Sequence, residues 1–435
     1  MLVAVVMLFV VGAMAALSID VVTIYTARSE AQLAADAGAL AGARVFANSG
    51  VTSDASRRST RNARNLATMI ATQVASQNVV GGRTLNPSTE VTVSFPNERD
   101  PAFDTNPHVT VQTQRTDLPT FFARIWGRTA NTVTASATAE AYNPSGADAV
   151  NSGSATIPVA PLCVKPWLLP NIDPTQSSST GPAIFDSSGD ILNANLVGKG
   201  WPNAPVANPN TNGLYSLCNG DCSLGNGGIT PVAPGAYYPG AVADFSPIQA
   251  SPACASGFNS YQLAVAGCVQ TPISCGTSSS INNSSVNIDP IPYVPNNGTR
   301  DADTVAAAEC LIHYVTSPGD SDSIDTATTR PPFQFLGGNQ NPVAGAVGKE
   351  VMVSDSLVTI PVINNPPPNT PTSSTVQVIG FLQVFLNPQS LAMPLPANQI
   401  SATIINMAGC GTSATGQPIF GNGASPVAVR LISPP

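Results

Sequence analysis

The stretch "ALSIDVVTIYTARSEAQLAADAGALAGARVF", residues 16–46, decides how this chain is organised. It continues an apolar run that starts at Met1, meets its first charged residue at Asp20, and leads into a series of small residues. We predict one continuous helix from Met1 to Ala47, which at about 1.5 Å per residue would be on the order of 70 Å long. Its first half belongs in a membrane and its second half does not.

The apolar half of this helix is long enough to cross a bilayer. No charged side chain occurs between Met1 and Ile19, and this length nearly matches the roughly 20 residues that span the hydrocarbon core. Tyr25 suits the lipid–water interface, and Arg28 marks the beginning of the water-exposed part. Ala13-Met14-Ala15 also resembles a signal-peptidase site. The absence of basic residues before it and the apolar character beyond it favour a retained anchor over a cleaved signal.

The second half of the helix carries small residues at three- and four-residue spacings. Such spacing places them on one helix face, and a face of small side chains lets another helix approach closely. The predicted packing face consists of Ala27, Ala31, Ala34, Ala35, Gly38, Ala41 and Gly42.

The order of polar and small residues in this stretch resembles the N-terminal signature of the TadE/TadG-like proteins of bacterial Tad (Flp) pilus assembly. In that family an apolar helix leads into an Asp-Val-x-x-x-Tyr-x-x-Arg segment and then a Gln-x-Ala-Ala-Asp-Ala-Ala-Ala-Leu-Ala-Gly-Ala segment. The chain departs from the family at Leu33, where Ala is more usual, and in having no basic residue before the apolar run. The residues that the resemblance assigns to a helix-packing motif are Asp20, Tyr25, Arg28, Gln32, Ala35, Asp36, Leu40, Ala41 and Gly42.

Composition and cysteine usage favour an extracytoplasmic protein. Only 10% of the 435 residues are charged and the net charge is −8, which argues against a nucleic-acid partner. No cysteine occurs before residue 163, and an even number in the loop-rich part indicates disulfides formed in an oxidising compartment. Free thiols packed as small hydrophobic groups are the alternative. The disulfide candidates are Cys163, Cys218, Cys222, Cys254, Cys268, Cys275, Cys310 and Cys410.

The cysteines also decide the expected orientation. By the positive-inside rule alone, Arg28 and Arg44 would keep the C-terminal side in the cytoplasm. Because disulfides need an oxidising compartment, we instead expect a single-pass protein of the bacterial inner membrane with its C-terminal region in the periplasm or at the cell surface. This orientation would require a basic leader before Met1.

A small α+β, pilin-like domain is predicted over residues 49–142, after the membrane and stalk helix of residues 1–48. Ser53 or Asp54 can cap a second helix that ends near Gln77. Arg57, Arg58, Arg61 and Arg64 would occupy its solvated face. Alternating apolar residues predict strands around 91–95, 109–111 and 132–142.

"LPTFFARIWG", residues 118–127, is expected to form a short helix that precedes the last of these strands. Its apolar side chains Phe121, Phe122, Ile125 and Trp126 are expected in the core. This segment and the strand after it extend the resemblance to TadE/TadG-like proteins.

The remaining chain is predicted to be a linker, residues 143–155, and an irregular, β-rich, Pro/Gly/Asn-rich extracytoplasmic region, residues 156–435. Turn-forming residues exclude long helices there, except around 303–315. The fold class is therefore α+β: a long N-terminal transmembrane and stalk helix, a small α+β domain, and a disulfide-containing β-rich region. Strands in the last region are expected at 351–353, 357–362, 376–386, 400–407 and 427–432.

Residues with catalytic or metal-binding chemistry are few. His108 and His313 lie within apolar patterns, which favours structural roles. Asp320, Asp322 and Asp325 could gather oxygens around Ca²⁺, but their spacing fails the helix-loop-helix calcium motif, so a solvated acidic loop is favoured. Two further weak candidates are the half-site of Cys218 and Cys222, with no second pair, and the Asp186–Asp190 segment, which lacks the last Ser of a von Willebrand-type metal site. We expect no metal, no cofactor and no enzymatic activity.

The predicted function is a non-enzymatic, envelope-anchored component of Tad/Flp pilus assembly, similar to TadG or to a minor pilin. It would pack against other pilus assembly proteins through the small-residue helix face and expose a disulfide-stabilised ectodomain. The alternative is a membrane-anchored adhesin or surface-binding module, with a cell-surface or substratum ligand. An extracytoplasmic hydrolase is a remote third candidate, because no catalytic constellation is present.

Overall fold

The fold was analysed in a computed structural model of the 435-residue chain. The residues that the structure describes are 2–54, 60–120, 122, 130–147, 159–173, 182–186, 191–198, 215–216, 238–240, 248–249, 253–273, 285–287, 299–325, 330–364, 375–388, 401–410, 419–420 and 425–432.

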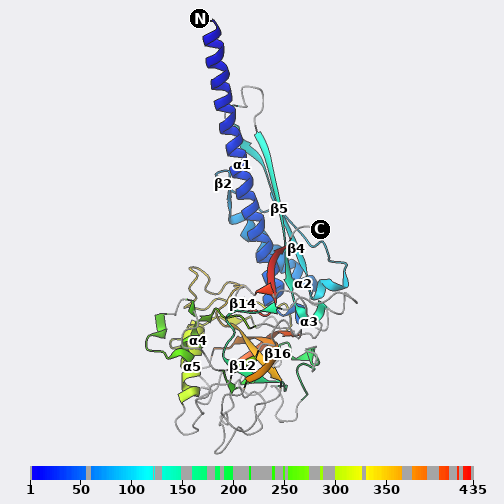
Figure 1. Ribbon diagram of the computed structural model, residues 1–435, viewed down its shortest axis with the longest axis vertical. Coiled ribbons are helices and arrows are strands. Elements are labelled where there is room, and N and C mark those ends of the chain that lie inside the picture. Colours follow the sequence, from blue (N-terminus) through cyan, green and yellow to red (C-terminus); the bar gives the residue numbers. More distant parts are fainter. Residues whose placement is uncertain are drawn as a thin grey trace, which may run out of the picture.

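Helix α1, Leu2–Asn48, is the longest element and organises the molecule. It begins alone at one end, passes along a β-sheet, and ends against the C-terminal region at the other end (Figure 1). The predicted helix from Met1 to Ala47 is thus confirmed over the described residues. The chain turns away at Gly50, whose φ of 83° is a left-handed conformation that glycine adopts without strain.

A four-stranded antiparallel sheet in the order β19-β5-β4-β3 packs against α1. Strands β4, His108–Pro119, and β5, Ala130–Tyr142, form a long hairpin that rises beside α1 (Figure 1). Strand β3, Val91–Ser94, pairs with the other edge of β4, and all three strands were expected from the sequence. Strand β19, Ala428–Ile432, returns from the far end of the sequence and pairs with β5.

Helix α2, Thr60–Gln77, covers the same part of α1. Alanines four residues apart form its buried face, because this spacing brings side chains onto one side of a helix. The chain then forms a short hairpin of β1, Val79–Val80, and β2, Arg83–Thr84. The alanines of this buried face are Ala63, Ala67, Ala71 and Ala75.

One prediction in this region is corrected. Leu118 and Pro119 belong to β4 instead of a short helix, because Leu118 is paired with Asn131 across the hairpin. Ser53 lies in a short 3₁₀ helix, Val51–Ser53, and the cap of α2 at Ser53 or Asp54 stays a prediction, because residues 55–59 lie outside the described part of the chain. Of the remaining predicted residues, Phe121, Ile125, Trp126, Arg57 and Arg58 lie outside the described part of the chain.

The C-terminal region is built on a larger sheet in the order β8-β17-β16-β15-β7-β9, with β12 beside β16. Its centre is the antiparallel set β15, Leu357–Asn364, β16, Thr375–Leu386, and β17, Ser401–Gly409, as the sequence predicted. Val351–Val353 is not a strand. The outer strands are β7, Trp167–Pro170, β8, Tyr215–Ser216, β9, Tyr238–Pro239, and β12, Ser285–Asn287.

Two helices, α4, Ser260–Ala266, and α5, Thr299–Leu311, pack together on this sheet's apolar core. Helix α5 ends earlier than predicted because His313 adopts a left-handed φ of 59° and Tyr314 N donates to Glu309 O, which closes the helix end. The remaining short elements are α3, Pro144–Ala147, and the strands β6, Val159–Ala160, β10, Ile248–Gln249, β11, Cys268–Val269, β13, Ser323–Ile324, β14, Phe335–Leu336, and β18, Ile419–Phe420.

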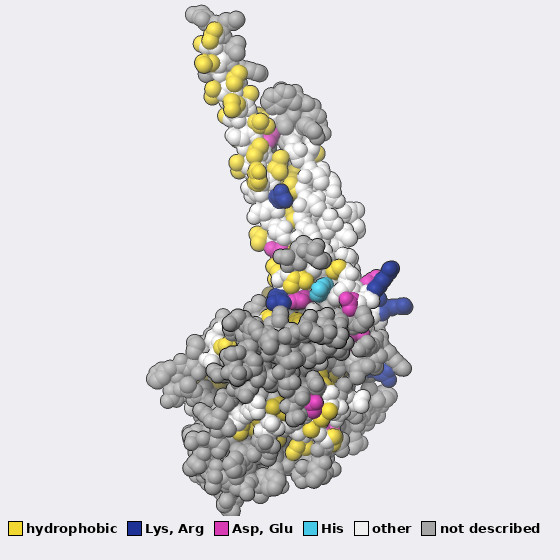
Figure 2. All heavy atoms as spheres, turned by 45° about the vertical axis from the view of Figure 1, so that its right-hand side comes forward, with side chains coloured by type: hydrophobic (Ala, Val, Ile, Leu, Met, Phe, Trp, Pro, Cys, Tyr) yellow, Lys and Arg dark blue, Asp and Glu magenta, His cyan; other side chains and the backbone are white. Residues whose placement is uncertain are grey.

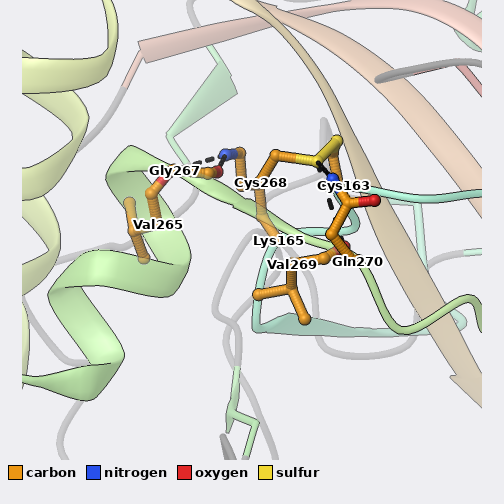
Figure 3. Close-up of a disulfide and its surroundings, with 7 residues drawn as sticks. All are labelled: Cys163, Lys165, Val265, Gly267, Cys268, Val269 and Gln270. Atoms are coloured by element: carbon orange, nitrogen blue, oxygen red, sulfur yellow. Dashed lines mark hydrogen bonds between the residues drawn. A yellow bond between two sulfur atoms is a disulfide. The ribbon is translucent and has the colours of Figure 1, made fainter. Parts of the chain in front are cut away.

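Two disulfides join described residues of the C-terminal region, as expected for a chain folded in an oxidising compartment. Cys254 is bonded to Cys310 of α5. Cys163 is bonded to Cys268, beside the buried amine of Lys165 (Figure 3). That amine donates to Val265 O and Gly267 O, both at 2.6 Å, and burial lowers its pKa to about 7. Cys410 is also disulfide-bonded, and Cys218, Cys222 and Cys275 lie outside the described residues.

Candidate functional site

The two halves of α1 have different surroundings, and this contrast defines the candidate site. Before Asp20, the described side chains stand clear of the protein: Val3 is 74% exposed and Met14 is 68% exposed. Apolar side chains are seen along this protruding end (Figure 2). Beyond Asp20, one face of the helix is buried along most of its length.

The buried face is the small-residue face, and it packs within the chain. Around Gly38, a Cβ atom would lie 2.9 Å from Ala75 Cβ and 3.1 Å from Ala71 O, so α2 approaches α1 too closely for any side chain. At Gly42 a Cβ atom would lie 2.8 Å from Val109 Cγ1 of β4. The alanines that share this burial are Ala27, Ala31, Ala34, Ala35, Ala39 and Ala43.

Polar groups of the motif also bond to the chain's own sheet. Gln32 Nε2 donates to Asp36 Oδ1 at 2.8 Å and to Ser136 O of β5 at 3.2 Å. Thr113 Oγ1 of β4 donates to Ala31 O at 3.0 Å. These bonds fix the rotation of α1 about its axis, so that its small face points at the sheet and α2.

Asp20 lies at the end of this packed stretch that is nearest the N-terminus. It is only 4% exposed, and its Oδ2 accepts from the backbone N–H of Phe122 at 3.0 Å, beyond the end of β4. The first charged residue of the helix is therefore also the first buried one among the described side chains.

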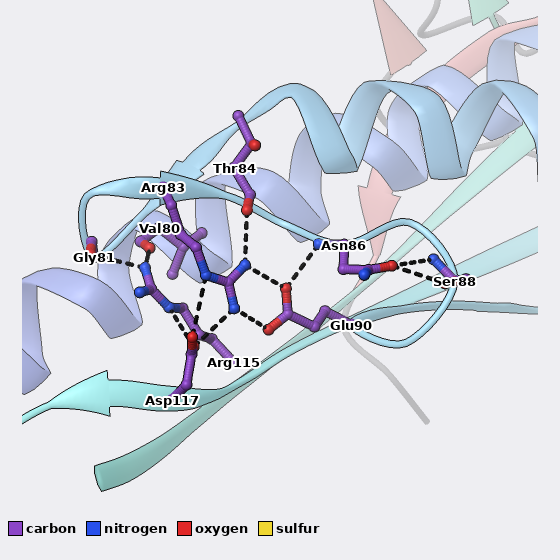
Figure 4. A network of polar contacts seen from close by, with 9 residues as sticks. All are labelled: Val80, Gly81, Arg83, Thr84, Asn86, Ser88, Glu90, Arg115 and Asp117. Carbon is purple, nitrogen blue, oxygen red and sulfur yellow. Dashed lines mark hydrogen bonds and ion pairs between the residues drawn. The ribbon is translucent and has the colours of Figure 1, made fainter.

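An ionic cluster holds the β1–β2 hairpin beside α1 (Figure 4). Arg83 is bonded to Glu90 at 2.6 Å and to Asp117 at 2.7 Å, and Arg115 is bonded to Asp117 at 2.9 Å. The hydrogen bonds from Arg83 and Arg115 lower the pKa of Asp117 to about 2. In the turn of this hairpin, the backbone N–H of Gly81 donates to Glu30 Oε2 of α1 at 2.6 Å.

The other motif residues lie toward solvent or at the edge of the packing. Tyr25 is 69% exposed and Arg28 is exposed, whereas Leu40 and Ala41 are half-buried. Leu33, where the family more often has Ala, is 63% exposed. The sequence thus grouped residues that the structure divides between an inner and an outer face.

A buried polar cluster, which the sequence analysis missed, joins the end of α1 to the C-terminal sheet. Asn406 Nδ2 of β17 donates to Ala47 O and to Gln383 Oε1, both at 2.6 Å, while Asn406 Oδ1 accepts from Ser53 Oγ at 3.2 Å. Asn143 Nδ2 reaches Met407 O at 3.0 Å. Asn406 within the apolar strand "ATIINMAG" was the available signal, because a buried polar side chain needs partners.

The other residues considered as catalytic or metal-binding candidates make contacts within the chain. His108 lies 3.5 Å from Glu140, and His313 lies 2.9 Å from Asp355, whose hydrogen bond raises the pKa of His313. Asp320 accepts from Thr316 N and Ser317 N, and Asp322 accepts from Gly338 N, Asn341 Nδ2 and Ser354 Oγ. Among the described residues, no three His, Cys, Asp or Glu side chains are grouped as a metal site. Ser187–Asp190, Cys218 and Cys222 lie outside them.

A comparison with protein families finds a match for the first part of the chain, which includes most of α1. Residues 1–45 match the family described as "Putative Flp pilus-assembly TadE/G-like". The N-terminal segment is TadE/G-like. Within the described part of the chain, α1 is the one helix long and apolar enough to cross a membrane, judged by length and composition. No curated protein and no solved structure matches the chain.

The TadE/G-like match supports involvement in Flp pilus assembly and ends within α1, so it does not extend to the sheets. The family resemblance expected from the sequence is confirmed for this segment. That the small-residue face packs against other pilus proteins stays a prediction, and in the structure this face already has partners within the chain. The predicted domain boundaries also stay a prediction. The pairing of β19 with β5 shows in addition that the two ends of the sequence meet in one sheet.

Proposed function

We propose that the chain is a non-enzymatic, membrane-tethered component of Flp pilus assembly. The observation that carries this proposal is the protruding, uncharged end of the TadE/G-like helix, whose described side chains are exposed where the rest of α1 is packed. Exposed apolar side chains on an unaccompanied helix are costly in water and favourable in lipid. The first part of α1 is therefore the anchor, and the second part is the stalk on which the body is built.

The C-terminal region lies at the opposite end of the molecule from the N-terminus (Figure 1). With the anchor in the inner membrane and the disulfides on the oxidising side, this region would stand away from the bilayer, in the periplasm or at the cell surface. The same position favours a second candidate function, an anchored adhesin whose C-terminal region contacts a surface. The two functions differ in whether pili form without the protein.

The test uses cells that carry the Flp pilus genes but lack this gene. The full chain is expected to restore pili, whereas a variant lacking residues 2–19 should fold, leave the membrane fraction and restore no pili. A matched control replaces residues 2–19 with an unrelated apolar segment of equal length, which should return the protein to the membrane. Pili restored by the variant without an anchor would overturn the proposal. Normal pili in the gene-deleted cells, combined with lost attachment to surfaces, would favour the adhesin.

A further inference from the structure

The uncharged end of α1 has the length of a bilayer core, and this fixes the level at which the body meets the membrane. From Leu2 to Ile19 the helix would be about 27 Å long at 1.5 Å per residue, close to the hydrocarbon thickness of roughly 30 Å. Asp20, the next residue, is already covered by protein. If the first segment is the anchor proposed above, the bilayer surface lies at Asp20.

The end of the β4–β5 hairpin lies at this same level. The strands are still paired at Pro119 and Ala130, and the backbone N–H of Phe122 is bonded to Asp20 Oδ2. The ribbon view shows the hairpin rising along α1 toward its protruding end (Figure 1). A second element of the protein therefore reaches the membrane boundary beside the helix.

The side chains exposed at this level suit lipid better than water. On α1, Val21 is 42%, Val22 is 63% and Tyr25 is 69% exposed. On the hairpin, Phe122 is half-buried, and its backbone N–H is bonded to Asp20. Apolar and aromatic side chains gather at the headgroup level of membrane proteins, where their apolar bodies are buried and their polar ends stay wet. We call Val21, Val22, Tyr25 and Phe122 the collar.

We infer that the collar is a second membrane-contact site, which holds the described end of the β4–β5 hairpin at the headgroups of the bilayer. The inference rests on the proposed anchoring of α1 and adds to it. A helix alone leaves the body free to tilt, because tilt is set by packing and by interfacial anchors. With the hairpin also seated on the surface, the stalk is held at a fixed angle to the bilayer.

The test places a tryptophan probe in the collar. Full-length protein carrying Phe122→Trp, in a background with Trp126→Phe and Trp201→Phe, is reconstituted into phosphatidylcholine vesicles that contain lipids brominated near the headgroup. The emission of the background protein, which keeps the buried Trp167, is subtracted. About half of the probe's emission is expected to be quenched, since the ring would lie at the interface. The matched control is Leu192→Trp in the same background, because Leu192 is 60% exposed in the C-terminal region. Its emission should be unaffected.

The possible results of this experiment distinguish a failure of the collar proposal from a failure of the anchor proposal. Protein that does not float with the vesicles would contradict the proposed anchor itself. Protein that floats while the probe at position 122 remains as unquenched as the control would overturn the collar and leave the anchor standing. Tyr25→Trp provides a second probe at an exposed position in case the hairpin variant fails to fold.

Discussion

Gly38→Leu is expected to lower the free energy of unfolding by about 3 kcal/mol, because over-packing a filled site forces backbone and side chains apart. A Cβ atom at position 38 would already lie 2.9 Å from Ala75 Cβ and 3.1 Å from Ala71 O, and the second of these is backbone. The added side chain would separate α1 from α2, so the whole N-terminal unit should lose stability. Urea unfolding of the full chain in detergent, followed by tryptophan fluorescence, measures the change.

The matched control is Ala41→Leu, one turn further along the same helix. Ala41 is half-buried, so its replacement should change the free energy of unfolding by less than about 1 kcal/mol. From the sequence alone, changes at Gly38 and Ala41 would have been expected to act together, on association with other proteins and not on folding. Equal stability of the two variants would contradict the packing of α2 on Gly38.

Asn406→Ala is expected to destabilise the protein by about 3 kcal/mol, since it leaves buried groups without their hydrogen-bond partners. Asn406 is fully buried, and its amide serves both the end of α1, at Ala47 O, and the neighbouring strand, at Gln383 Oε1. Ser53 Oγ would lose an acceptor as well. The effect should appear as looser coupling between α1 and the C-terminal sheet, and a lower unfolding midpoint measures it.

Asn339→Ala serves as the control for this substitution. Asn339 is exposed in the same C-terminal region, so truncation of its side chain should cost within about 0.5 kcal/mol. If Asn406→Ala unfolds at the same denaturant concentration as Asn339→Ala, the polar cluster does not hold the two parts together.

Much of the fold could be predicted because its signals are local. The uncharged run before Asp20 predicted the first part of α1, alternating residues predicted β4, and runs of β-branched and apolar residues predicted β5, β15 and β16. The pairing of β19 with β5 could not be predicted, since nothing within residues 428–432 indicates which edge they will join. The early end of α5 was missed for a different reason: it depends on the left-handed conformation of His313, which is uncommon for any residue other than glycine.

The candidate site was predicted in its composition but not in its partners. Small residues at Gly38 and Gly42 indicate that something approaches closely, and the spacing is the same for a helix of the same chain or of another protein. The structure fills this face with α2 and β4. Asp20 was noted as the end of the apolar run, whereas its bond to Phe122 depends on a residue about a hundred positions away.

The central claim is that the second half of α1 packs within the chain itself. Amide hydrogen exchange of the purified full chain, in lipid and without any pilus protein, tests this claim most directly. The account predicts that the amides of Ala34–Ala47 exchange as slowly as those of β4 and β5, because all three elements open together. Gly38→Leu should accelerate their exchange, and Ala41→Leu should not. Fast exchange of Ala34–Ala47 in the isolated protein, slowed only when other pilus proteins are added, would contradict the account.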